Sequence, residues 1–296
     1  MIPNVETSVT QQDNRLGILL MIATTLVFSI QDVLTRHLAE NYSPLMVVMI
    51  RYWAFGLFVI VLATRAPGGL RGAARTSQPV LQILRGLLLA AEIVIMALAF
   101  VRLGLVETHA AFTAYPLIVA ALSGPVLGEK VGWRRWSAIA AGFVGILIIL
   151  QPGRGALQPA AVIPLVAAAT FATYALLTRY ASRKDSARTC FFWTGVSGAV
   201  AMTGIGLWVW EPMAPDDWIW MAALSLSGLL GHWLLIRSYA VAEASAVQPF
   251  AYMQLPFAAI LGMVLFNEAL RPNVATGAAI IVTAGVFTLW RERQTR

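Results

Sequence analysis

Ionisable side chains inside apolar runs are the residues of this sequence whose chemistry stands out. Glu92 lies within LLLAAEIVIMALAF, and a shift of 140 residues places it on His232 in a second apolar run. An ionisable group in a low-dielectric environment is costly, so each is a candidate for binding or proton transfer. Glu92 and His232 could bind a zwitterionic or cationic solute, or Glu92 could load and release a proton. The alternatives are that Glu92 caps a polar group of a neighbouring helix and that His232 is an ordinary core histidine.

Asp32 and Arg51 occur in two further apolar runs that are separated by a short polar stretch. At about 1.5 Å per helical residue, both lie near 10 Å deep from the same membrane face. We expect them to form an ion pair, because pairing lowers the desolvation cost of each charge. Such a pair would act as an outer gate or a charged substrate anchor, or it would only tie two neighbouring helices together. His109 is expected at the outer interface.

Aromatic and amide side chains are expected around these charges. Amphipathic side chains at midplane depth suit an organic ligand that has an apolar body and a few polar atoms. For any one aromatic side chain among them, ordinary packing is the more common role. The predicted substrate-binding set contains, besides Glu92 and His232, the residues Tyr115, Tyr252, Gln248, Phe28, Gln31, Tyr174 and Phe112.

Three prolines within apolar runs predict helix breaks. A proline removes one backbone hydrogen bond and clashes with the carbonyl four residues earlier. Pro116 and Pro256 would free the carbonyls of Phe112 and Tyr252, and Pro249 would add a second break. A packing kink is the alternative. Because Pro116 and Pro256 occupy equivalent places in two halves of the chain, we favour the interpretation that both are hinges beside a central substrate cavity.

The elements that position these residues are predicted to be membrane-spanning helices. The chain has 59% hydrophobic and 12% charged residues and a mean hydropathy of +0.74. Soluble domains have about 45–50% apolar and about 25% charged residues. This balance excludes a soluble globular domain, and it excludes a disordered chain, which needs the opposite composition. One crossing needs about 20 apolar residues. The runs that qualify are 16–38, 44–64, 79–101, 105–127, 133–151, 158–180, 188–210, 216–241, 245–267 and 272–290.

The basic residues predict the orientation in the membrane. Most arginines and lysines between the runs lie in segments on the side of the N-terminus. The positive-inside rule therefore places both termini in the cytoplasm of a cell with this protein in its inner (plasma) membrane. The net charge of +7 is then a topology signal, and nucleic acid is not an expected partner.

The two halves of the sequence repeat one pattern. A shift of 140 superposes Pro116 on Pro256, and Glu129 lies within one residue of Glu268. A shift of 143 places the segment 34–36 on 177–179, both Leu-Thr-Arg. The repeat unit has five spans, an odd number, so the second copy enters the membrane in the opposite sense, as is typical of secondary transporters. The predicted fold is an all-α polytopic membrane protein with ten transmembrane helices in two inverted five-helix repeats. The expected modules are 16–151 and 158–290, with cytoplasmic tails 1–15 and 291–296.

Two segments resemble the modules of the drug/metabolite transporter superfamily, EamA type. These are ALAFVRLGLVETHAAFTAYPLIVAALSGPVLGEKVGWRRW and SYAVAEASAVQPFAYMQLPFAAILGMVLFNEAL. The LGE at 127–129 matches the family pattern, whereas Asn267-Glu268 replaces the usual Gly-Glu. The resemblance covers essentially the whole chain. It implies a ten-helix transporter of small organic metabolites, with a central cavity lined by helices 1, 3, 4, 6, 8 and 9. Similar members move amino acids, nucleoside-like metabolites such as S-adenosylmethionine, riboflavin, or metallophores.

The sequence shows no signature of an enzyme, a metal site or a cofactor. It has no Walker loop, no HExxH and a single cysteine, Cys190, so neither ATP hydrolysis nor a cysteine-based metal site is expected. The predicted function is secondary active transport or exchange of a small organic metabolite by alternating access around a midplane cavity, with proton coupling as one energy source. The alternatives are a membrane-embedded lipid-modifying enzyme and a non-transporting scaffold. Small residues in the fifth and tenth spans could pack within the chain or support a homodimer.

Overall fold

The computed structural model of the protein describes residues 13–129, 132–150, 162–280 and 283–284, and these are helical without strands. The first half contains α1 (Asn14–Ala39), α2 (Pro44–Arg65), the short α3 (Gly69–Ala74), α4 (Pro79–Phe112), α5 (Ala114–Leu127) and α6 (Trp133–Leu150). The second half contains α7 (Val162–Ala181), α8 (Ala187–Gly206), a 3₁₀ turn (Leu207–Val209), α9 (Asp217–Val241), α10 (Ala244–Ala251), α11 (Gln254–Phe266) and a helix over 272–280.

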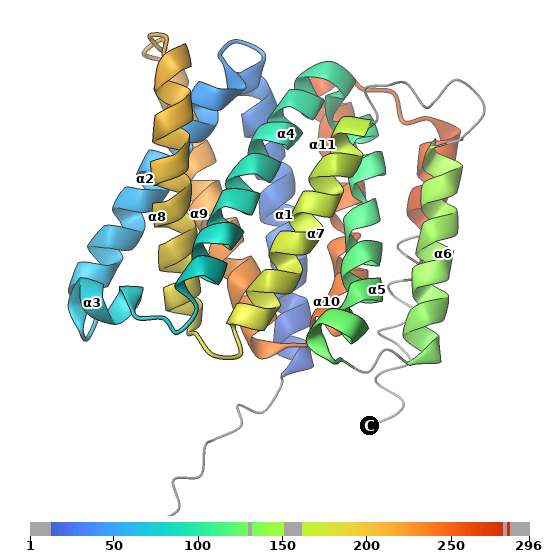
Figure 1. The fold of residues 1–296 in the computed structure, drawn as a ribbon. Helices are drawn as coiled ribbons and strands as arrows, with labels where there is room; N and C mark the ends of the chain where they lie inside the picture. Colours follow the sequence, from blue (N-terminus) through green and yellow to red (C-terminus); the bar gives the residue numbers. More distant parts are fainter. Residues whose placement is uncertain (1–12, 130–131, 151–161, 281–282, 285–296) are drawn as a thin grey trace, which may run out of the picture.

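Seven helical stretches within the described residues are long and apolar enough to cross a membrane. One of them, Pro79–Leu127, has 49 residues, more than twice what one crossing needs. It turns at Gly104, whose φ of 78° is non-helical, and Figure 1 shows α4 rising to this turn and α5 descending from it. The chain is therefore an all-α polytopic membrane protein, as the sequence predicts.

The remaining predicted spans are only partly described. The apolar part of α6 is short, Trp136–Ile148, and the predicted span 272–290 is helical over 272–280. The residues before 13 in the N-terminal tail, the junction 151–161 between the predicted modules, and the C-terminal tail 291–296 lie outside the described residues.

Equivalent helices of the two halves run in opposite directions. In Figure 1, α1 runs upwards and its counterpart α7 downwards, while α2 runs downwards and α8 upwards. The most extensive helix pairs are α1 with α9, α4 with α7, and α2 with α8. Each of these pairs joins one half to the other, so the two halves interdigitate around a shared core rather than meeting at a single flat interface.

Glycines in α8 allow its close approach to α2. An added Cβ at Gly195 would lie 2.8 Å from the ring of Phe55, and one at Gly198 would overlap the ring of Tyr52. Small residues at a helix interface let two backbones come together in the absence of a hydrophobic driving force in lipid.

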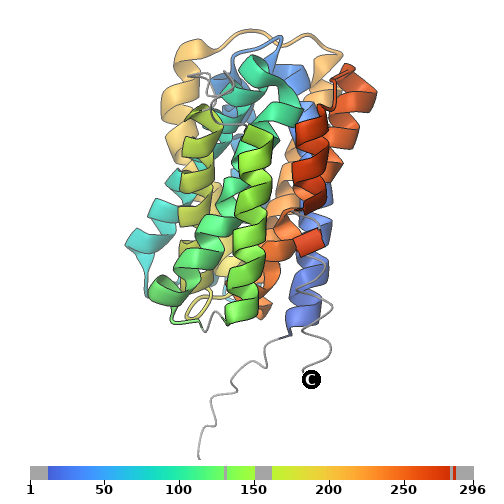
Figure 2. The same ribbon diagram turned by 90° about the vertical axis from the view of Figure 1, so that its right-hand side faces the viewer.

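The outer surface and the edge of the bundle suit a lipid environment. Large apolar side chains such as Leu19, Leu57, Val200, Leu226 and Val264 are exposed on it. The helix α6 packs mainly on α4 and α5, and Figure 2 shows it at one face of the molecule beside the helix of residues 272–280. Gly142 on α6 faces Tyr252 and Leu117 of the same chain, so this small face is used for internal packing.

Candidate functional site

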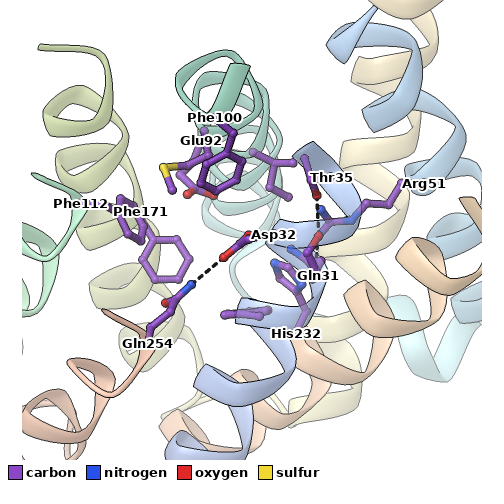
Figure 3. Close-up of a pocket in the computed structure, with 13 residues that line it drawn as sticks. Gln31, Asp32, Thr35, Arg51, Glu92, Phe100, Phe112, Phe171, His232 and Gln254 are labelled. Atoms are coloured by element: carbon purple, nitrogen blue, oxygen red, sulfur yellow. Dashed lines mark hydrogen bonds between the residues drawn. The ribbon is translucent and has the colours of Figure 1, made fainter. Parts of the chain in front are cut away.

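A cavity lies at the centre of the helix bundle, and Figure 3 shows thirteen residues around it. Its free volume is about 30 Å³, which holds only a few water molecules. Small-molecule sites have about 300–1,000 Å³, so this cavity must widen to admit a metabolite. All of the lining residues are buried. They come from α1 (Phe28, Gln31, Asp32, Thr35), α2 (Arg51), α4 (Glu92, Ile93, Met96, Phe100, Phe112), α7 (Phe171), α9 (His232) and α11 (Gln254). The family resemblance implies the predicted spans 16–38, 79–101, 105–127, 158–180, 216–241 and 245–267. The lining helices α1, α4, α7, α9 and α11 lie in these spans, and α2 is an addition.

Helical periodicity explains why α1 contributes four residues. Phe28, Gln31, Asp32 and Thr35 follow the i, i+3, i+4, i+7 spacing, which places side chains along one stripe of a helix. The hydroxyl of Thr35 donates to the carbonyl oxygen of Gln31 at 2.9 Å. This local bond satisfies the hydroxyl and leaves the carboxyl and amide groups of the stripe for contacts with other helices.

Asp32 and Arg51 line the same cavity but do not pair with each other. Arg51 Nη2 donates to Gln31 Oε1 at 3.0 Å, and Gln254 Nε2 donates to Asp32 Oδ2 at 3.1 Å. Within the described residues no ion pair joins Asp32 to Arg51, so the expected direct pair is corrected. Consecutive residues of a helix point about 100° apart. Arg51 therefore meets position 31, while position 32 faces α11.

His109 provides a further contact to the Asp32 carboxylate. Its Nε2 atom lies 3.0 Å from Asp32 Oδ2, and its side chain is only 1% exposed. The expectation that His109 lies at the outer interface is therefore wrong. The turn at Gly104 starts a new helical segment that carries His109 back into the bundle.

The carboxylate of Glu92 differs from that of Asp32 because it lacks a protein partner. Glu92 is 5% exposed, and it forms no hydrogen bond or ion pair with the described part of the chain. Figure 3 shows it on the cavity wall formed by α4, next to Phe100. A buried polar group without a partner carries a large desolvation penalty, and a ligand that donates hydrogen bonds to it would remove that penalty.

His232 lies across the cavity on α9 and is 2% exposed. Its Nδ1 atom is 2.9 Å from the carbonyl oxygen of Gly228. A carbonyl oxygen only accepts, so Nδ1 carries a proton, and in a neutral ring Nε2 is then an acceptor. The imidazole packs against Phe28 with 4.9 Å between ring centroids. Glu92 and His232 thus contribute acceptors to one cavity.

Aromatic rings form much of the remaining wall. Phe112 and Phe171 lie 5.7 Å apart between centroids, and Tyr115 packs behind both at 4.8 Å from each. Tyr115, which the sequence places in the substrate set, therefore supports the wall without lining it. Tyr174 lies deeper in α7, with the guanidinium carbon of Arg85 5.4 Å from its ring centroid, and it does not line the cavity either.

The predicted pair Gln248 and Tyr252 also lies away from the cavity. Gln248 Nε2 donates to the hydroxyl of Tyr239 at 2.8 Å. Tyr252 packs with Leu117 and Leu255 in a separate apolar cluster. Their predicted placement assumes that Gln248 and Tyr252 keep one shared helical face in the run 245–267. The break between α10 and α11 invalidates that assumption and brings Gln254 into the cavity instead.

Sequence reasoning did not select several lining residues. Gln254 is an amide in an apolar run two residues before Pro256, and this position is a signal that could have identified it. The other unselected lining residues are Thr35, Ile93, Met96, Phe100 and Phe171. The apolar ones do not differ in sequence from ordinary core residues.

The predicted helix breaks occur beside the cavity, each just before a proline. Thr113 separates α4 from α5 three residues before Pro116, and Met253 lies between α10 and α11 three residues before Pro256. The carbonyl of Tyr252 is not free as expected, because it accepts from the backbone N–H of Leu255 at 3.1 Å.

The expected additional break at Pro249 does not occur. The helix α10 continues through Pro249. Pro249 is the sixth of its eight residues, and the helix ends two residues later at Ala251, so little helix follows the missing hydrogen bond.

Comparisons with known proteins find similarity to membrane transporters. The model of the EamA-like transporter family matches residues 15–151 and 158–290. The S-adenosylmethionine uptake transporter of Rickettsia prowazekii is 24% identical over 278 residues, 94% of each chain. The riboflavin transporter of Vibrio cholerae is 29% identical over 285 residues, 95% of each chain. A solved crystal structure with 17% identity covers 95% of this chain and 99% of its own, with a TM-score of 0.70, which supports the fold alone.

Proposed function

This chain belongs to the EamA-like transporter family, and from that premise we propose that it carries a small organic metabolite across a bacterial inner membrane by alternating access. The chain is a multi-pass membrane protein and a transporter rather than an enzyme, as its similarity to named transporters indicates. The proposal adds the mechanism, the class of substrate and the residues that bind it.

The unpartnered carboxylate of Glu92 is the observation that carries the proposal. A charged or polar group buried without a partner is unfavourable, so its retention in an apolar helix needs a reason. A solute that enters the cavity and donates to Glu92 supplies one. Asp32, by contrast, already has Gln254 and His109 beside it, which suits a structural role at the cavity edge.

The composition of the cavity favours a cationic or zwitterionic solute with a flat ring system. Its ionisable groups are the carboxyl groups of Asp32 and Glu92, the guanidinium of Arg51 and the imidazole of His232. The acidic excess favours a positive group near Glu92, while Arg51 can accommodate a carboxylate. The rings of Phe28, Phe100, Phe112 and Phe171 supply apolar and cation–π contacts. S-adenosylmethionine has this chemistry, whereas riboflavin has the flat ring without the cation.

The transport cycle uses the two helix breaks. The segments before Pro116 and Pro256 flank the cavity through Phe112 and Gln254, so bending at them would open it. The interdigitated inverted halves would expose the cavity to one side at a time. Both termini lie in the cytoplasm, as the distribution of basic residues favours. Glu92 exchanges a proton for the substrate if transport is proton-coupled.

Uptake into liposomes tests the proposal. Purified protein should take up S-adenosylmethionine or a related cationic metabolite in a saturable manner from a panel that includes riboflavin and amino acids. Glu92→Gln should lower uptake by about 10- to 100-fold, because a hydrogen bond to a charged group is worth about 1.5–3 kcal/mol. If protons are coupled, an imposed pH gradient should drive uptake by the wild type and not by Glu92→Gln.

Asp216→Asn is the matched control, because Asp216 is an exposed carboxylate just before α9, away from the cavity. It should transport like the wild type. Uptake of a cationic solute that is unchanged in Glu92→Gln would contradict the assigned role of Glu92. A properly inserted protein that moves no solute of the panel would contradict the transport function and favour a scaffold or a lipid-modifying enzyme.

A further inference from the structure

Two glutamates outside the cavity occupy equivalent places at opposite ends of the molecule. Glu129 follows Gly128, which ends α5 with φ 67°, and Glu268 follows Asn267, which ends α11 with φ 53°. In Figure 1, α5 ends at the bottom of the bundle and α11 at the top. Each carboxylate contacts an arginine and the beginning of a helical segment in the other half of the chain.

The Glu268 cluster consists of Glu268, Arg36, Leu105 and Val106. The backbone N–H groups of Leu105 and Val106 donate to Glu268 Oε1 and Oε2, both at 2.9 Å. Arg36 at the end of α1 forms an ion pair with Glu268 Oε1. A carboxylate at a helix N-terminus is stabilised by the free N–H groups and the helix dipole. This cluster joins the end of α11 to α1 and α4.

The Glu129 cluster consists of Glu129, Arg179 and Ala244. Arg179 Nε at the end of α7 and the backbone N–H of Ala244, the first residue of α10, both lie 3.2 Å from Glu129 Oε1. The side chains of Glu129 and Arg179 are only 4% and 8% exposed. This cluster joins the end of α5 to α7 and α10, which are the counterparts of the elements in the Glu268 cluster.

From these contacts we infer that Glu268 and Glu129 are the residues that close the two ends of the transport pathway, and that each cluster must separate for its own end to open. Both clusters are formed in this structure, and the cavity between them is enclosed by buried residues. Each cluster joins one half of the chain to the other, so relative movement of the halves at one end breaks one cluster and preserves the other.

The chemistry of the clusters suits reversible closure. Breaking a largely buried pair leaves charges that are unfavourable without water, but water reaches an end of the membrane as it opens and replaces the lost contacts. Glu107 and Arg271 form another ion pair between the halves, at side chains that are 40% and 62% exposed. Exposed pairs contribute little, so the buried clusters carry the closure.

Gly104 fits the same interpretation. Its φ of 78° is a conformation that favours glycine, and an added Cβ would lie 2.7 Å from Glu268 Oε1. The absence of a side chain at this turn therefore lets the carboxylate reach the N–H groups of the next helical segment.

Thiol labelling tests the inference without a substrate. The inference depends on the proposed transport function, but labelling reports which end is open even if no solute is identified. A Met96→Cys probe in the cavity, in a Cys190→Ser background, is reacted with a membrane-impermeant methanethiosulfonate from either side of oriented vesicles. Glu268→Gln should speed labelling about tenfold from the end at which α11 terminates, and Glu129→Gln should do so from the opposite end, since about 1.4 kcal/mol corresponds to a tenfold shift.

Glu40→Gln is the matched control. Glu40 accepts from Arg36 Nε at 2.8 Å within the same helical stretch and does not join the two halves, so its neutralisation should leave labelling unchanged. If a glutamate variant does not fold, Arg36→Gln and Arg179→Gln replace the pair and should act at the same two ends. Wild-type labelling rates in the cluster variants, an increase from the same side for both, or an equal increase in Glu40→Gln would overturn the inference.

Discussion

Asn267 illustrates how a single departure from a family pattern is explained by backbone geometry. The equivalent position in the first half is Gly128, and both residues adopt positive φ at the end of a helix. Asparagine is one of the few other residues that tolerate this conformation. The replacement of Gly by Asn therefore keeps the turn that precedes the glutamate. The sequence alone showed the replacement, but the positive φ that explains it is visible only in the structure.

The polar residues of the cavity could largely be selected from the sequence, because a charge in an apolar run is conspicuous. Glu92, His232, Asp32, Arg51 and Gln31 all line it. Their partners could not be selected in the same way. Whether Arg51 reaches Gln31 or Asp32 depends on a rotation of about 100° between adjacent helical positions, and this is fixed only when the helices are packed.

Tyr42 provides a prediction at the residue scale, in the loop between α1 and α2. Its hydroxyl donates to Asp217 Oδ2 at 2.6 Å and accepts from the backbone N–H of Ala214 at 2.9 Å. The hydrogen bond to Asp217 raises the pKa of Tyr42 above its usual value of 10.0. A raised folded-state pKa contributes stability below the unfolded pKa and loses it as the pH rises through the folded value.

We therefore expect Tyr42→Phe to lower the thermal unfolding midpoint at neutral pH. The difference from the wild type should decrease above about pH 10, where the tyrosine ionises. Thermal unfolding in detergent at pH 7 and at alkaline pH measures both. A variant with the wild-type midpoint at neutral pH would show that this loop contact does not stabilise the fold.

At the scale of the helices, the positions of the breaks could be predicted from the sequence, but their effect on side-chain direction could not. The long apolar runs and Pro116 and Pro256 predicted the spans and the positions of their interruptions. The rotation that follows each break could not be predicted, because it depends on which backbone hydrogen bonds re-form, such as that between Leu255 and Tyr252. This is why Gln254 and not Tyr252 lines the cavity.

The close packing of α2 and α8 gives a prediction at the same scale. Gly198→Val should lower the unfolding free energy by about 3 kcal/mol, since an overpacked interface typically costs about 1–3 kcal/mol or more and the new side chain would overlap Tyr52. Gly204→Val on the same helix is the control, because nothing lies within 4 Å of an added Cβ there. Thermal unfolding in detergent measures both, and equal midpoints for the two variants would contradict the assigned packing.

At the scale of the whole molecule, the inverted repeat places the helix breaks and the glutamate clusters twice. Phe112 before Pro116 and Gln254 before Pro256 line one cavity, and Glu129 and Glu268 lie at the two ends of the molecule. The sequence predicted the repeat because shifts of 140 and 143 residues superpose similar residues of the two halves. It did not predict the interdigitation of the halves, in which α4 packs on α7 and α1 on α9, since a repeat fixes topology but not which helices meet.

Equilibrium binding tests the central claim most directly. A panel of cationic, zwitterionic and neutral metabolites is titrated against purified wild type, Glu92→Gln and Asp216→Asn, with thermal stabilisation as the signal. We predict that a cationic or zwitterionic solute with a flat ring stabilises the wild type and Asp216→Asn alike. Its Kd should rise about 10-fold or more in Glu92→Gln. Equal Kd values for the same solute in all three proteins would contradict a substrate site at the central cavity that depends on Glu92.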